Sequence, residues 1–122
     1  MKIRIKGNSI RYRLTRPEVE IFCKTGFFTE TTVFGEGIFT YTLQANYEVN
    51  ELNACLGDNT ITMYFPGAEK DNWAHNAKVG FEHSMQLNNG TALFLLVEKD
   101  FVCLDETIED QSNNYPRSNG KK

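Results

Sequence analysis

Basic residues crowd the start of the chain, where six of the thirteen Lys and Arg residues lie in the first sixteen positions without an acid among them. Five of these bases alternate with other residues along two short segments: Lys2, Arg4, Lys6, Arg11 and Arg13. Arg offers a planar fork of donors to phosphate or carboxylate, and Lys adds a point charge. This pattern predicts an anion-binding face with the arginines as direct ligands.

A β-hairpin must position these bases on one face. Apolar residues alternate with them, as in half-buried strands, and Gly7-Asn8 between the two segments is a turn signal. With that pair as the loop, Arg4 falls opposite Arg11 and Lys2 opposite Arg13. Like charges directly opposite on paired strands are destabilising, so the face needs water, a bound anion or carboxylates. The candidate carboxylates are Glu30, Glu48 and Glu82.

A solvated face is the simpler interpretation of the same pattern. Antiparallel sheets commonly keep one face on the core and the other in water, and charged alternation is ordinary on the wet face. The sequence leaves this interpretation open beside the anion-binding hypothesis.

A second polar cluster follows the most apolar segment, Ala92 to Val97. Glu98, Asp100 and Asp105, with His83 on the neighbouring predicted strand, are residue types that ligate metals. Their spacing matches no zinc motif, and the chain has only two His residues. We therefore predict no metal site and keep these four residues as the positions to examine.

Three widely spaced cysteines without a CxxC pair are typical of a reduced, intracellular protein. We expect Cys23 and Cys55 to pack in the fold. Cys103 could act as a nucleophile only with a nearby base such as His83, and an inert, buried thiol is the interpretation we favour. The chain contains no Ser-His-Asp motif, Gly-rich phosphate loop or paired catalytic carboxylates. The sequence thus identifies no catalytic residue and indicates no cofactor.

The remaining elements form a regular series of hairpins and short helices. Thr15 and Glu18 have capping-box spacing around Pro17, which predicts a helix of about ten residues ending at Thr25-Gly26. A second short helix is predicted over about Ala68 to Asn76. The other three hairpins pair segments rich in β-formers, and their ranges are Phe27–Phe34 with Ile38–Ala45, Leu52–Leu56 with Thr60–Phe65, and Val79–Leu87 with Thr91–Lys99.

The order of these elements is hairpin, helix, hairpin, and then the same three again. It predicts an α+β fold whose eight strands form a mostly antiparallel, strongly curved sheet or open barrel with two short helices. We expect one domain over residues 1–104 and a polar tail over 105–122, because the tail lacks a core pattern.

Composition limits the classes of function. The chain has 122 residues and a net charge of −3, and the segment after Arg16 carries all sixteen acids against seven bases. Such an acidic body argues against nucleic-acid binding as the main activity. No apolar segment is long enough to span a membrane and no signal peptide is visible, so we expect a cytoplasmic protein.

Three segments together resemble a family of small uncharacterised bacterial proteins that carry a domain of unknown function over their whole length. The most specific pieces are KIRIKGNSIR, Trp73-Ala74 followed by Val79-Gly80, and Glu98-Lys99-Asp100-Phe101 with Cys103-Leu104. The resemblance covers nearly all of the chain. It implies no activity, so no catalytic residue can be transferred.

These observations favour a small non-enzymatic domain that binds an anionic ligand or a protein, although they do not decide whether the protein is an enzyme. A metal-dependent enzyme acting on phosphoesters or triphosphates is one alternative. Basic strands in an antiparallel fold loosely resemble the CYTH-type triphosphate tunnel enzymes, but the acidic ExExK strand of those enzymes is absent here. The other alternative is a homodimer formed through an exposed edge of the Phe-rich second hairpin.

Overall fold

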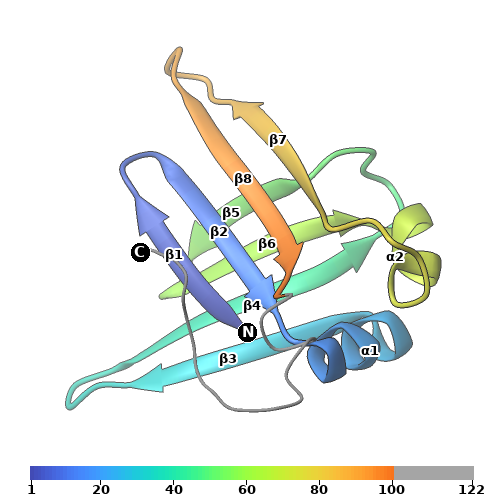
Figure 1. The fold of residues 1–122 in the computed structure, drawn as a ribbon. Helices are drawn as coiled ribbons and strands as arrows, with labels where there is room; N and C mark the ends of the chain where they lie inside the picture. Colours follow the sequence, from blue (N-terminus) through green and yellow to red (C-terminus); the bar gives the residue numbers. More distant parts are fainter. Residues whose placement is uncertain (101–122) are drawn as a thin grey trace, which may run out of the picture.

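The computed structural model describes residues 1–100, which form eight strands and two helices (Figure 1). The predicted order of elements is confirmed. Residues 101–122 lie outside the described residues, and so do Cys103, Asp105 and the predicted tail. The elements are β1 Lys2–Lys6, β2 Ser9–Leu14, α1 Arg16–Thr25, β3 Phe27–Val33, β4 Ile38–Asn46, β5 Asn53–Gly57, β6 Thr60–Pro66, α2 Gly67–Trp73, β7 Gly80–Gln86 and β8 Ala92–Lys99.

The strands form two separate four-stranded sheets, so the expected single curved sheet or open barrel is wrong. Sheet A has the order β1-β2-β8-β7 and sheet B the order β3-β4-β6-β5. Pairing is antiparallel within each hairpin but parallel where two hairpins meet, at β2 with β8 and β4 with β6. The sheets are separate because each helix connection carries the chain from one sheet to the other.

The two halves of the chain are related in topology. The first half contributes β1-β2 to sheet A and β3-β4 to sheet B, and the second half contributes β7-β8 to sheet A and β5-β6 to sheet B. If β1, β2, β3 and β4 are matched in turn with β5, β6, β7 and β8, the order of sheet A becomes β5-β6-β4-β3, which is the order of sheet B read from its other edge. The predicted architectural repeat is therefore present, and its hairpins are divided between the two sheets.

Turn residues set the register of the hairpins as predicted. Gly7-Asn8 closes the first hairpin, with Arg4 opposite Arg11. Asp58 and Asn59 both adopt positive φ, 53° and 58°, which suits the tight turn between β5 and β6. The last hairpin has the predicted three-residue loop, because the Leu87 N–H donates to the Thr91 carbonyl oxygen at 2.9 Å.

Local capping fixes both ends of α1. The Glu18 carboxylate accepts the backbone N–H of Thr15 at 2.8 Å, as expected of a capping box. At the other end, Gly26 has φ 93° and its N–H donates to the Phe22 carbonyl oxygen at 2.8 Å. α2 starts directly after Pro66 and ends at Trp73, three residues before the predicted end. Both helices lie together at one end of the sheets (Figure 1).

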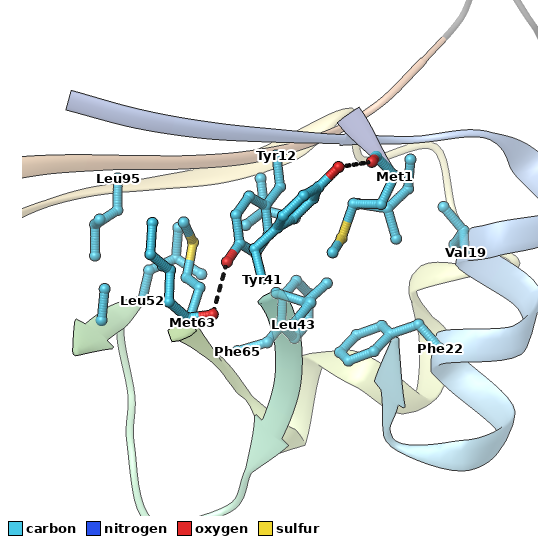
Figure 2. Packing of buried hydrophobic residues seen from close by; sticks show 14 of the residues in the cluster. Met1, Tyr12, Val19, Phe22, Tyr41, Leu43, Leu52, Met63, Phe65 and Leu95 are labelled. Carbon is cyan, nitrogen blue, oxygen red and sulfur yellow. Dashed lines mark hydrogen bonds between the residues drawn. The ribbon is translucent and has the colours of Figure 1, made fainter. Parts of the chain in front are cut away.

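The core lies between the two sheets and beneath the helices. Figure 2 shows residues of both sheets pointing toward one another, with Tyr12 and Tyr41 side by side. At the helical end, the fully buried Trp73 contacts Phe65 of sheet B and Phe81 of sheet A, with ring centroids 5.1 and 5.7 Å away. The indole N–H donates to the Lys78 carbonyl oxygen at 3.0 Å, which satisfies its polar group. This aromatic cluster joins α2 to both sheets.

Within residues 1–100, no helix has the length and apolar character needed to cross a membrane.

Candidate functional site

The predicted basic residues share the outer face of sheet A. Lys2 pairs with Arg13, and Arg4 with Arg11, as the alternation predicts. Tyr12 and Leu14, which alternate with these bases on β2, are buried in the core. The hairpin therefore presents its bases away from the core.

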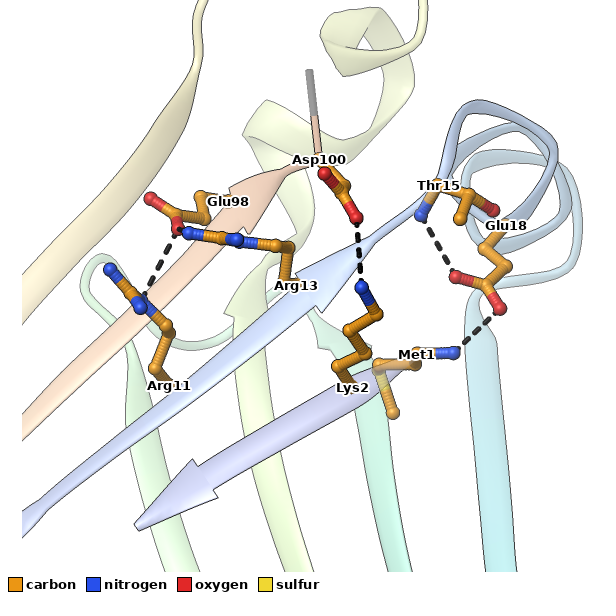
Figure 3. A network of polar contacts seen from close by, with 8 residues as sticks. All are labelled: Met1, Lys2, Arg11, Arg13, Thr15, Glu18, Glu98 and Asp100. Carbon is orange, nitrogen blue, oxygen red and sulfur yellow. Dashed lines mark hydrogen bonds and ion pairs between the residues drawn. The ribbon is translucent and has the colours of Figure 1, made fainter. Parts of the chain in front are cut away.

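Glu98 of β8 neutralises part of this face. Its Oε2 accepts hydrogen bonds from Nε and Nη2 of Arg13 at 3.0 and 2.8 Å, and it lies 3.2 Å from Nε of Arg11 (Figure 3). The contact follows from the parallel pairing of β2 with β8, which places Arg13 beside Glu98. The side chain of Glu98 is only 16 % exposed, so the pair is partly shielded from water.

Lys2 has a different carboxylate. Its ammonium lies 3.4 Å from Oδ2 of Asp100, a residue that is 3 % exposed. The backbone N–H of Asp100 also donates to the Leu14 carbonyl oxygen at 2.8 Å, which holds the end of β8 against β2. The prediction that the carboxylates would be Glu30, Glu48 or Glu82 is wrong. The strand beside the basic hairpin is β8, and it supplies Glu98.

Arg4 and Lys6 form no ion pair with any carboxylate of residues 1–100. Together with Arg11 they line a shallow recess of about 190 Å³ on the outer face of sheet A. Phe94 and Leu96 of β8 line the same recess, and so do Ser9 and Ile10 of β2. The recess therefore combines an apolar floor with two basic side chains that have no ion-pair partner within residues 1–100.

Among the described residues considered for a metal, His83 lies apart from Glu98. Glu98 lies on the outer face of sheet A, where the arginines hold it. His83 pairs with the buried Leu95, so it points to the opposite face, and its Nδ1 lies 3.7 Å from Oε1 of Glu51. Asp105 lies outside the described residues. Residues 1–100 contain no group of three or more His, Cys, Asp or Glu that could hold a metal ion.

The two described cysteines are both free thiols, in different settings. Cys23 is half-buried against the core, as expected, and burial raises the pKa of its thiol despite the nearby Lys70 and Lys99. A raised pKa leaves the thiol protonated and a poor nucleophile. Cys55 is exposed on β5, so the expectation that it packs in the fold is wrong. Its register places it opposite Thr62, on the side of sheet B away from the core.

Sequence reasoning missed a second charged cluster, at the amino group of Met1. This ammonium is partly buried and lies 2.6 Å from one carboxylate oxygen of Glu18 and 2.6 Å from one of Glu30. Figure 3 shows the contact with Glu18. The hydroxyl of Tyr41 donates to the Met1 carbonyl oxygen at 2.8 Å (Figure 2). The signal in the sequence was Glu30, an acid at an inward position of a strand otherwise rich in Phe and Thr.

Comparison with known proteins gives a family and no function. The model of the family of unknown function DUF7009 matches residues 1–119. No curated protein and no solved structure matches the chain.

Proposed function

We propose that this chain, which belongs to the family DUF7009, is a binding module for a small organic anion. The ligand lies in the recess on the outer face of sheet A, with its anionic group on Arg4, Lys6 and Arg11. The observation that carries this proposal is the absence of an ion pair for Arg4 and Lys6 within residues 1–100, beside an apolar floor.

The charge balance of this face supports the proposal. Within residues 1–100 the five bases form ion pairs with two carboxylates, Glu98 and Asp100, and Glu98 is shared by two arginines. Glu82 of β7, opposite Leu96, is a third carboxylate on the same face and forms none of these ion pairs. Arg4 lies directly opposite Arg11, a like-charge pair that is unfavourable on adjacent strands. An anion between them would turn this repulsion into two charge-assisted hydrogen bonds, each worth about 1.5–3 kcal/mol.

The apolar floor determines the chemical class of the ligand. Phe94 is 37 % exposed, which is unusual for a Phe at the centre of a sheet, and Leu96 follows it on the same face. An organic phosphate or carboxylate would cover these side chains with its carbon skeleton, whereas inorganic phosphate would leave them in water. We therefore assign the site to an anion that carries an apolar or aromatic group.

The lining favours binding over catalysis. Among the described residues that line the recess, Ser9 has a hydroxyl, but none is a carboxylate, His or Cys that could activate it. Lys6 and Ser9 are the two lining residues with a nucleophilic side-chain atom, and the site can hold and orient an anion through its charges.

Thermal unfolding of the full chain tests this function. The midpoint is measured with inorganic phosphate, pyrophosphate, phenyl phosphate and benzoate at fixed ionic strength, because a ligand that binds only the folded state raises it. We expect phenyl phosphate to give a larger shift than inorganic phosphate at the same concentration. Arg4→Ala and Lys6→Ala should each weaken binding about ten-fold or more, the equivalent of about 1.5 kcal/mol.

Lys24→Ala is the matched control, because it removes an exposed base from α1, outside the recess. Each variant is compared with its own midpoint without ligand, so a change in basal stability does not enter the result. The proposal is wrong if none of the four anions shifts the midpoint, or if Arg4→Ala responds as Lys24→Ala does.

A further inference from the structure

The outer face of sheet B carries no charged side chain. The registers of the three strand pairs show which residues share this outer face. These residues alternate along the strands with side chains that point into the core, such as the buried Tyr41, Leu43, Ile61 and Met63. Asp, Glu, Lys and Arg make up 24 % of the chain, and the outer face of sheet A carries both signs, so this absence is distinctive. The residues are Phe27, Thr29, Thr31, Val33, Ile38, Thr40, Thr42, Gln44, Thr60, Thr62, Tyr64, Asn53, Cys55 and Gly57.

One border of this face is the free edge of β3. Sheet B has the order β3-β4-β6-β5, and no described strand pairs with the far side of β3. The Phe34 N–H donates to the Gly37 carbonyl oxygen, and the Ala45 N–H to that of Gly26. Even-numbered residues of this strand therefore bond to β4. The backbone groups of Thr29, Thr31 and Val33 point to the open edge, whereas those of Phe27 are already bonded to the Thr25 hydroxyl.

Apart from the inward-pointing Glu30, β3 lacks the features that protect a sheet edge from pairing. Its seven residues contain no Lys, Arg, Pro or Gly, and its one acid, Glu30, is held by the Met1 ammonium. The edge of sheet A at β1, by contrast, carries three bases, which is a common defence. Apolar side chains also remain in water along the hairpin, since Val33 is 74 % and Phe34 61 % exposed.

We propose that a second copy of this chain pairs antiparallel along β3 and joins two B sheets into one eight-stranded sheet. A twofold axis at Thr31 places Glu30 opposite Thr32, whereas an axis at Glu30 would place two carboxylates opposite each other, so the first register is favoured. In this register Val33 lies opposite Thr29 of the second copy, and Phe34 opposite Phe28.

The neutral face makes a second copy the fitting partner. Each chain has a net charge of −3, so a contact through an uncharged face avoids repulsion between like charges of the two copies. On the outer face, pairing along β3 brings together only Thr, Val and Phe side chains, while Glu30 on the inner face lies opposite Thr32, and the pairing also satisfies the outward backbone groups. Seven paired residues bury less than a standard interface, so we expect an equilibrium that depends on concentration.

Sedimentation of the full chain over roughly 1–200 µM, with reductant present, tests the proposal. The mass should rise from 14.0 kDa toward twice that value with concentration. Thr31→Lys places two like charges at the axis and should weaken association at least ten-fold. Asn53→Lys puts the same charge on the same face at its other edge, on β5, and should leave association unchanged.

A cross-link gives an independent measurement that does not depend on how well Thr31→Lys folds. In a Cys55→Ser background, Thr31→Cys should form a covalent dimer on mild oxidation, because the two thiols face each other across the axis. A chain that stays monomeric at every concentration overturns the proposal. Equal weakening by Thr31→Lys and Asn53→Lys also overturns it, since association would then use the face and not the edge.

Discussion

Tyr12 and Tyr41 place two phenol groups in the core between the sheets. Tyr12 is fully buried and its hydroxyl donates to the Ile61 carbonyl oxygen at 3.3 Å, while Tyr41 donates to that of Met1. Burial raises the pKa of both phenols above the usual value of 10.0. Folding therefore favours the protonated form of both side chains.

This burial predicts alkaline destabilisation. Above pH 10 the unfolded chain loses these protons and the folded chain retains them, so the free energy of unfolding falls as pH rises, by about 1.4 kcal/mol per pH unit for each fully retained proton. Urea unfolding at pH 8.0, 10.0 and 11.0 measures the slope. Tyr12→Phe should lower stability at pH 8 through the lost hydrogen bond, and its slope above pH 10 should be shallower.

Lys99 acts in the opposite direction. Burial against Trp73 lowers the pKa of its ammonium below the usual 10.5. As pH rises, the folded chain therefore releases this proton before the unfolded chain does, and between the two pKa values the free energy of unfolding increases with pH. The comparison of Tyr12→Phe with the parent chain cancels this contribution. Parallel pH profiles for the two proteins would contradict the assignment of the alkaline slope to Tyr12.

Among the strands, the hairpins were predictable and their assembly into sheets was not. Gly7-Asn8 and Asp58-Asn59 fix their registers through local turn chemistry, and alternation then assigns each side chain to a face. The pairing of β2 with β8 joins residues 85 positions apart, such as Arg13 and Glu98, and no local pattern encodes it. The basic face could therefore be predicted, but its carboxylate partners could not.

Gly80 at the start of β7 shows how closely two strands approach. A Cβ at this position would overlap the Val97 carbonyl oxygen and lie 2.8 Å from Cα of Glu98, both of them backbone atoms that cannot move aside. Gly80→Ala should therefore lower stability by about 1–3 kcal/mol through overpacking. The midpoint of urea unfolding measures this loss.

Gly35 in the β3–β4 turn provides the matched control. A Cβ there meets no atom within 4 Å, so Gly35→Ala should change stability by no more than about 0.5 kcal/mol. Equal midpoints for the two variants would show that β7 can shift away from β8 at no cost.

For the protein as a whole, Trp73 is the side chain that joins α2 to both sheets. Its ring contacts Phe65 and Phe81, which belong to different sheets, and it is completely buried. Trp73→Ala should therefore cost about 3–5 kcal/mol, the range for removing a large core aromatic. Because the variant lacks the only Trp, unfolding is followed by circular dichroism.

Leu56 is the contrasting apolar position. It is 75 % exposed on β5, so Leu56→Ala should change stability by less than about 0.5 kcal/mol. A loss from Trp73→Ala no larger than that from Leu56→Ala would mean that the sheets hold together without the aromatic cluster.

The division of each half between two sheets has a consequence for synthesis of the chain. β8 is the last described strand to leave the ribosome, yet it occupies the centre of sheet A between β2 and β7. Both hairpins of sheet B have been synthesised once β6 has emerged, so β4 can pair with β6 before β8, the partner of β2, is available. Until residue 99 emerges, the nascent polypeptide carries an unpaired β2 edge and lacks the core side chains Leu95 and Val97. This is the interval in which we expect it to depend most on chaperones.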